Sequence, residues 1–260
     1  MKTTLTSLFV LCTFFCFAQE INEINESVRF GNANYHVLKS DEQTKHGPYT
    51  IKSYSGNTDL VNGTYEHGKK TGKWTERYYR KRQNLKSTGT YRNDIKVGKW
   101  IFYNTQGEII QEYDFDKKEL ISSTECSSKT TYEVYQNNVK TRSKLDCPAL
   151  YIGGKQALID ELLKKISESF QFDQKEKEKK YVKFENFISF LIDENGNLEN
   201  LEFYDDVKIP NLKKFIETEL NNKKGMWIPG ELKGEKVKSN VDILLSINLM
   251  FTNDNELVQN

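Results

Sequence analysis

A stretch near the end of the chain, residues 237–249, alternates between apolar and polar side chains with a period of two. Its odd positions are apolar apart from Ser239, and its even positions are polar apart from Leu244. Side chains of a strand point alternately to opposite faces, so this period predicts a β-strand with one buried face and one wet face. The stretch is long for a strand, and its apolar row requires further strands and helices to cover it.

The first 18 residues have the pattern of a secretory signal peptide. Lys2 supplies a positive start, an apolar run follows over residues 5–17, and Ala18 is the small residue before the cleavage point. The apolar run is too short to remain as a bilayer span. A lipoprotein signal through Cys16 is the alternative, which the bulky residues before that cysteine disfavour. We therefore expect an exported protein whose mature chain begins at Gln19.

Export changes the interpretation of the cysteines, because two of the four leave with the signal peptide. The mature chain keeps Cys126 and Cys147. An even pair in an oxidising compartment first predicts a disulfide. A reactive thiol would need a histidine base nearby, and the three histidines lie far upstream. Two free, buried thiols are the remaining alternative.

A repeat with an offset of 26 residues runs through the first half of the mature chain. Gly63-Thr64-Tyr65 is followed by Gly72-Lys73-Trp74, and Gly89-Thr90-Tyr91 is followed by Gly98-Lys99-Trp100. A partial earlier copy begins at Gly47. Self-similarity at a fixed period predicts an array in which each unit covers the next unit's apolar face. We expect each glycine to supply a positive φ at a turn, and each aromatic residue to pack across the neighbouring strand.

In the C-terminal part of the chain the pattern changes to that of helices and a hairpin. Apolar residues at three-to-four spacing predict a helix that starts near Gly154, and a second helix has Pro210 in its first turn. Between them an Asn-Gly turn at residues 195–196 joins two strands. The charge run over residues 174–180 is interpreted as a solvated loop. With the final strand, these elements predict two helices that cover one face of a three-stranded antiparallel sheet.

Two families share these features. Over residues 45–120 the repeats resemble the MORN repeat and the related YwqK-type antitoxin-like repeats, which implies stacked β-hairpins. Residues 147–251 resemble the TonB C-terminal domain through Tyr151-Ile152-Gly153-Gly154, through residues 189–196 and through Trp227-x-Pro229-Gly230. The second resemblance implies a periplasmic module that pairs peptide segments against a sheet edge, and hence the periplasm or outer envelope of a Gram-negative-type bacterium. The chain departs from that family in having only four prolines and no spanning linker.

The predicted fold class is α+β, with an N-terminal all-β hairpin-repeat array and a C-terminal, TonB-like sheet of three strands with two helices. The predicted parts are, in order, a signal peptide (1–18), a leader (19–44) expected to be loose, the MORN-like repeats (45–120), a connector (121–147), the TonB-like domain (148–251) and a tail (252–260).

Positive charge is concentrated in the repeats. Residues 63–100 have a net charge of +8, whereas the whole chain has a net charge of +1. A basic sheet can meet anionic lipid headgroups, polysaccharides or the acidic remainder of the chain, and solvated outer faces of hairpins are the simpler interpretation. The candidate polyanion-binding residues are Arg77, Arg80, Lys81 and Arg82. A nucleic acid partner is not expected for an exported chain.

The sequence contains no recognisable catalytic or metal-binding motif. His46 and His67 lie beside repeat glycines without further ligands at metal-binding spacing. The acidic turn at residues 193–195 lacks the ligand series of a calcium loop. A nucleophile with its base and a phosphate-binding loop are also missing. We therefore expect a non-enzymatic protein without a cofactor.

The long final strand suggests how such a protein binds its partner. In the TonB-like arrangement this strand lies at a sheet edge, whose unpaired backbone groups can accept a strand from another chain. The candidate pairing residues are Asp242, Ile243, Leu244, Leu245, Ser246, Ile247 and Asn248. The expected partner is an extended segment of an envelope protein or a second copy of the chain, while the basic repeats serve a second partner. The rival hypothesis is a structural or antitoxin-like repeat protein that binds an anionic surface or a toxin and uses its C-terminal domain as a cap.

The signal-peptide hypothesis predicts where the exported protein begins. N-terminal sequencing of the protein recovered from the envelope should start at or near Gln19. An intact Met1 in that protein would contradict the hypothesis.

Overall fold

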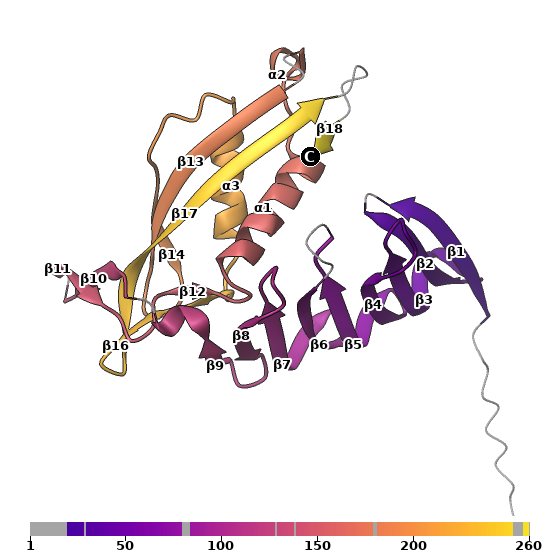
Figure 1. Ribbon diagram of the computed structural model, residues 1–260, viewed down its shortest axis with the longest axis horizontal. Helices are drawn as coiled ribbons and strands as arrows, with labels where there is room; N and C mark the ends of the chain where they lie inside the picture. Colours follow the sequence, from indigo (N-terminus) through magenta and orange to yellow (C-terminus); the bar gives the residue numbers. More distant parts are fainter. Residues whose placement is uncertain are drawn as a thin grey trace, which may run out of the picture.

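The computed structural model describes residues 20–28, 30–79, 84–127, 129–137, 139–178, 181–251 and 257–259. The chain forms two modules, a long N-terminal sheet and a C-terminal sheet covered by helices (Figure 1). Strands hold 57% of the structure and helices 15%. The protein is therefore predominantly a β protein, and the predicted α+β class is wrong.

The N-terminal sheet is an antiparallel meander in which each strand pairs with its neighbours in sequence. Its strands are β1 (Ile21–Val28), β2 (Gly31–Leu38), β3 (Asp41–Lys52), β4 (Asp59–Glu66), β5 (Lys69–Arg77), β6 (Leu85–Arg92), β7 (Ile95–Tyr103), β8 (Ile109–Asp114) and β9 (Glu119–Ser123). One 26-residue copy of the repeat corresponds to two strands, so the predicted repeat array is confirmed. It starts earlier than expected, because β1, β2 and the start of β3 lie within the predicted loose leader, 19–44. Polar side chains occupy both faces of β1, so no apolar period marks it.

The repeat glycines have two different roles. Gly72 and Gly98 have the predicted positive φ, with values of 65° and 59°, but they lie within β5 and β7 rather than at turns. At Gly63 and Gly89 the expectation of a positive φ is wrong. A Cβ added at either position would lie 2.2 Å from the indole ring of the tryptophan eleven residues later. These two glycines are required because a tryptophan ring lies directly against the backbone.

A row of aromatic rings and lysines, the aromatic–lysine ladder, crosses this sheet. Its rings are Tyr35, Tyr49, Tyr65, Trp74, Tyr91, Trp100, Phe102 and Phe115, with centroids of adjoining rings 5.0–6.2 Å apart. The Nζ atoms of Lys45, Lys70 and Lys96 lie 4.7, 4.3 and 4.7 Å from ring centroids in the ladder. Each such cation–π contact contributes about 0.5–2 kcal/mol. The ladder therefore gives the sheet a cohesive apolar layer of its own.

The C-terminal module is built around β17 (Glu235–Phe251), which pairs antiparallel with β13 (Tyr181–Ile192) from Ser239 to Met250. The other strands of its sheet are β10 (Thr131–Gln136), β11 (Val139–Lys144), β14 (Leu198–Phe203), β16 (Gly230–Leu232) and β18 (Leu257–Gln259), while β12 (Leu150–Tyr151) pairs with β15 (Trp227–Ile228). The helices are α1 (Lys155–Ser169), α2 (Gln174–Glu178), α3 (Leu212–Asn221) and the 3-10 helix η1 (Thr124–Ser127).

The odd-numbered side chains of β17 form the core of this module, as the alternating sequence predicts. Val241, Ile243, Leu245 and Ile247 are each at most 2% exposed. They belong to one cluster with apolar residues of α1 and α3 that recur at helical spacing. Full burial of each such aliphatic side chain stabilises the fold by about 1.5–3 kcal/mol.

The predicted C-terminal domain of two helices and three strands is wrong. The described residues form a seven-stranded sheet with three α-helices. The additional elements come from the predicted connector, which supplies β10 and β11, from the tail, which supplies β18, and from the charge run, which forms α2. In β10 and β11 only Val134 is buried, so this hairpin has no apolar period that a sequence pattern could reveal.

The two modules share a small core. Trp100, Phe102 and Tyr113 of the N-terminal sheet pack with Ile152, which directly follows β12. The side chain of Gln111 in β8 is only 1% exposed at this junction. Its Nε2 donates to the carbonyl of Tyr151 at 3.2 Å, and its Oε1 accepts from the N–H of Gly153 at 2.6 Å. A buried amide with both ends satisfied across the junction holds the two modules in one arrangement.

Two further links join the same regions. Lys86 Nζ of β6 lies 2.9 Å from Asp160 Oδ2 of α1. The predicted disulfide is confirmed, because Cys126 in η1 is bonded to Cys147 beside β16. This bond closes the loop that contains β10 and β11, and closing a loop of this length contributes about 3 kcal/mol.

The position of Gly63 against an indole ring predicts a large effect of a small substitution. Gly63→Ala should destabilise the repeat sheet by about 1–3 kcal/mol, because the added methyl group forces Trp74 out of its site. Urea denaturation followed by tryptophan fluorescence measures the change. The neighbouring, exposed Thr64→Ala is the control and should shift the midpoint much less. Equal midpoints for the two variants would contradict this explanation of the repeat glycine.

Candidate functional site

One flank of β17 has no partner strand over its middle. On one side β13 pairs with β17 from Ser239 to Met250. On the other side β10 pairs with Lys238 and Ser239, and β18 pairs with residues 249–251. Within the described part of the chain, no strand pairs with residues 240–248 on this second side. We call this segment the open flank.

All seven residues predicted to pair with a partner, 242–248, lie in the open flank. The prediction that the strand lies at a sheet edge applies to this segment only, since the sheet order places β17 between β10 and β13. The unpaired stretch and β18 lie along the same side of β17 (Figure 1).

The hydrogen-bond pattern shows which backbone groups face the open flank. The N–H of Tyr204 donates to the carbonyl of Phe187 at 2.9 Å, so the backbone polar groups of Phe187 point towards β14. Leu244 is the residue directly opposite Phe187 on β17. Directly opposed residues of an antiparallel pair point their backbone groups either at each other or both away. The N–H and C=O of Leu244, and of the other even-numbered residues from 240 to 248, therefore point into the open flank.

The flank opens because β10 leaves the sheet. Val134 pairs with Ser239, but the next N–H, that of Glu133, donates to Oδ1 of the Asn240 side chain at 2.7 Å. The side chain of Asn240 belongs to the even-numbered, wet face of β17. The hairpin β10–β11 thus bends over this wet face and leaves the backbone beyond residue 239 unpaired.

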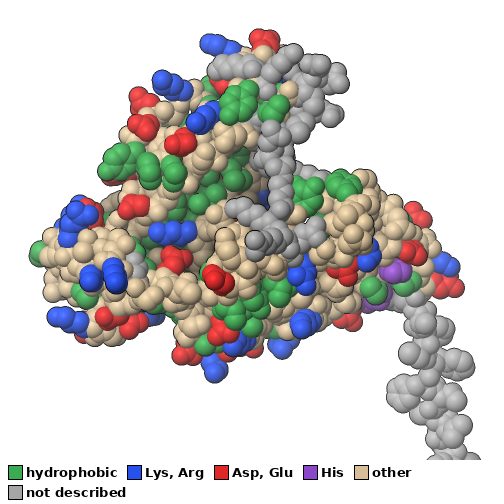
Figure 2. Space-filling model, in the orientation of Figure 1, with side chains coloured by type: hydrophobic (Ala, Val, Ile, Leu, Met, Phe, Trp, Pro, Cys, Tyr) green, Lys and Arg blue, Asp and Glu red, His purple; other side chains and the backbone are tan. Residues whose placement is uncertain are grey.

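A hollow of about 600 Å³ lies on the wet face between this hairpin and the strands β13 and β14. Its lining includes the charged side chains Glu133, Lys140, Arg142, Glu202 and Asp242 together with Phe187 and Tyr204. Figure 2 shows exposed apolar side chains among charged ones on the C-terminal module. The volume is within the range of ligand-binding clefts.

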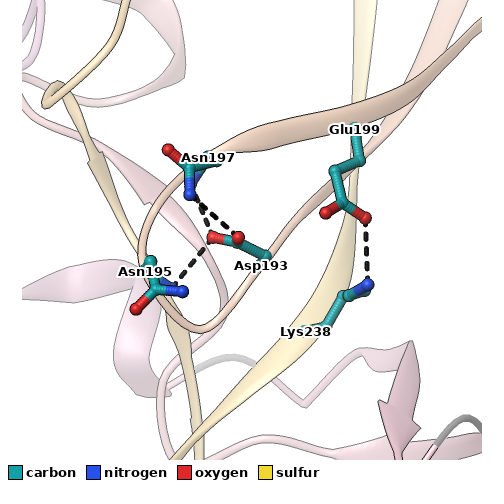
Figure 3. Close-up of polar contacts among 5 residues, drawn as sticks. All are labelled: Asp193, Asn195, Asn197, Glu199 and Lys238. Carbon is teal, nitrogen blue, oxygen red and sulfur yellow. Dashed lines mark hydrogen bonds and ion pairs between the residues drawn. The ribbon is translucent and has the colours of Figure 1, made fainter.

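Two sets of polar contacts fix the end of the sheet next to the hollow (Figure 3). In the β13–β14 turn, Oδ1 of Asp193 accepts from the backbone N–H groups of Asn195 and Asn197 at 2.9 and 2.7 Å, and its Oδ2 accepts from Nδ2 of Asn197 at 2.9 Å. Lys238 Nζ lies 2.9 Å from Glu199 Oε2, which ties the start of β17 to β14. Burial alone would raise the pKa of Asp193, but the hydrogen bonds from Asn197 and Asn195 outweigh it and lower the pKa.

Of the four predicted polyanion-binding residues, only one lies in the described part of the chain. Arg77 ends β5, whereas Arg80, Lys81 and Arg82 lie outside the described residues.

The lysines of the aromatic–lysine ladder were not predicted from the sequence. Each lies two residues before a repeat glycine (47, 72 or 98), a regularity that could have identified them. Burial lowers the pKa of Lys96, the lysine nearest the module junction.

The structure offers no metal centre in its described part. No group of three or more His, Cys, Asp or Glu side chains among those residues could hold a metal ion. The rings of His46 and His67 lie 5.0 Å apart, centroid to centroid, as an isolated pair. Among the helices of the described part, none is both long and apolar enough to cross a membrane.

Comparison with protein-family models, with curated proteins and with solved structures finds no match.

The lowered pKa of Asp193 predicts a pH-dependent effect of Asp193→Asn. A carboxylate whose pKa is lower in the folded state stabilises the fold above its unfolded pKa and loses this contribution as the pH falls through the folded value. At pH 7 the variant should be less stable than the parent by about 1–3 kcal/mol, and the difference should shrink below about pH 4. Urea denaturation across this pH range measures it. The exposed neighbour Glu194→Gln serves as control, and a difference that does not depend on pH would contradict the assignment.

Proposed function

We propose that this chain is a non-enzymatic binding protein of the cell envelope that captures an extended segment of another protein by strand addition to β17. The observation that carries the proposal is the open flank. Its even-numbered residues offer N–H and C=O groups in the spacing of an antiparallel ladder. The flank is longer than an average strand of about 5–6 residues, so an incoming segment can pair over its whole length.

The side chains next to the flank support this use. Exposed sheet edges are commonly protected by charges that face the approaching strand. The only charged side chain in the flank belongs to Asp242, whose Oδ1 accepts from Ser189 and whose Oδ2 accepts from Asn240, at 2.7 and 2.8 Å. This carboxylate is held by its own sheet. Leu244, in the middle of the flank, is 42% exposed.

Two features support an envelope location. The signal-peptide pattern of residues 1–18 favours export, although these residues lie outside the described part of the chain. The bond between Cys126 and Cys147 is of the kind that persists in oxidising compartments. In this proposal the basic repeat sheet serves a second, anionic partner such as lipid headgroups or polysaccharide.

A structural repeat protein is the second candidate function, and the module junction favours it. Ile152 is 3% exposed and covers the rings of Trp100 and Phe102 at one end of the repeat sheet. In that role the C-terminal module is a cap and the open flank has no partner. Cross-linking in intact cells followed by mass spectrometry distinguishes the two functions, because only a strand acceptor forms cross-links to another protein around β17.

Proline substitution tests strand addition, because it removes a single backbone donor. Leu244→Pro removes an N–H that points into the open flank, so the variant should keep its circular dichroism spectrum and lose its cross-linked partners. Leu244→Ala shortens the same side chain but keeps the N–H, so it should lose only the apolar contacts of that side chain and bind the partners more weakly, whereas Leu244→Pro should lose them. Leu245→Pro removes a donor bonded to β13 and should unfold the C-terminal module. A folded Leu244→Pro protein that still cross-links to the same partners would contradict strand addition.

A further inference from the structure

A row of exposed apolar side chains runs across the wet face of the C-terminal sheet and ends at the open flank. Tyr204 lies opposite Phe187, to which its N–H is bonded, and Phe187 lies opposite Leu244. The three side chains are 81%, 54% and 42% exposed. They thus lie side by side, Tyr204 directly after β14, Phe187 on β13 and Leu244 on β17, and we call them the apolar row.

The positions on one side of the apolar row are polar. Two residues away from it, Glu202, Ser189 and Asp242 lie opposite one another on the same three strands. On its other side the row is bordered by Glu185 and Ser246, which separate it from a second exposed pair, Tyr181 and Met250, at the far end of the same two strands. An exposed apolar surface with a polar rim is more often an interaction site than a chance result of composition.

A strand added at the open flank would continue the apolar row and also the polar row formed by Glu202, Ser189 and Asp242. Its residue opposite Leu244 would point its side chain to the wet face, about 4.5–5.5 Å from Leu244 between Cβ atoms. If the added strand is antiparallel, the residue two positions later would lie opposite Asp242. That position continues a row with two carboxylates, those of Glu202 and Asp242. Of the two cations that line the same hollow, Lys140 is paired with Glu133 at 2.7 Å, so Arg142 alone faces these two carboxylates and the row keeps a net negative charge.

We propose that the partner segment carries a large apolar residue opposite Leu244, followed two positions later by lysine or arginine. This inference rests on the proposed strand addition and names the chemistry of the partner. The apolar side chain covers Leu244 and Phe187, which are otherwise exposed to water, and the cation faces the row that ends at Asp242. The backbone supplies general affinity for extended segments, and the apolar row supplies specificity.

Selection from a random dodecapeptide phage library on the immobilised, disulfide-bonded mature protein tests this inference. The enriched peptides should carry Phe, Leu, Ile or Trp at one fixed position, with Lys or Arg two residues later. Phe187→Ser should remove the apolar preference and weaken the binding of selected peptides at least about tenfold, which corresponds to 1.4 kcal/mol. Tyr181→Ser is the matched control on the same strand and face, because Tyr181 is 50% exposed but lies outside the apolar row.

Three outcomes would overturn the inference. The first is a selection in which no peptides are enriched. The second is a Phe187→Ser, Tyr204→Ser double variant that still selects peptides with an apolar residue at the fixed position. The third is a dimer in sedimentation experiments that Phe187→Ser dissociates, since the occupant would then be a second copy of this chain.

The selected peptides also distinguish a failure of the specificity inference from a failure of strand addition. If they lack the apolar position but lose binding on Leu244→Pro, strand addition stands and the specificity fails, whereas binding that survives Leu244→Pro contradicts strand addition itself.

Discussion

The antiparallel ladder between β13 and β17 organises the C-terminal module and determines which backbone groups of β17 stay unpaired. It runs from Ser239 to Met250, and it places alternate side chains of β17 under α1 and α3. Because a strand buries every second residue, the same ladder leaves the even-numbered residues on a wet face. Shorter strands attach to its two ends. The middle of β17 therefore owes its order to β13 and the helices alone, and this allows its second flank to stay unpaired.

The disulfide and the module junction determine what surrounds this ladder. The hairpin β10–β11 is closed at its base by Cys126 and Cys147 and linked to the sheet near Asn240. The junction around Gln111 holds the repeat sheet against the C-terminal module. A partner bound to the repeat sheet and a partner bound to β17 would consequently be held in a defined arrangement. The aromatic–lysine ladder stabilises the repeat sheet through its own side chains, so that the outer face of each hairpin can vary.

Strong periodicity made part of the fold predictable from the sequence. The alternation over residues 237–249, the helical spacing after Gly154 and the Asn-Gly turn at residues 195–196 correspond to β17, α1 and the β13–β14 hairpin. The hairpin β10–β11 was missed because its stability comes from pairing with β17 and from the disulfide, and neither leaves a local pattern. Its absence from the prediction led to the incorrect domain of two helices and three strands.

The candidate site was predictable to a similar degree. The sequence pointed to residues 242–248, and the structure places them in a segment that is unpaired on one side. The apolar row could not be predicted, because it depends on the register of three strands that brings Tyr204, Phe187 and Leu244 together. For the repeats, the spacing of glycine and tryptophan was visible. Only the coordinates show that the tryptophan ring excludes any side chain at Gly63.

Amide hydrogen exchange along β17, measured residue by residue with NMR on the isolated mature protein, reports directly whether the open flank is unpaired. An unpaired flank predicts an alternation within residues 240–248. Even-numbered amides, which point into the open flank, should exchange quickly, while odd-numbered amides bonded to β13 should be strongly protected. Uniform protection of all these amides would show that the second flank is already paired, and strand addition at β17 would then be ruled out.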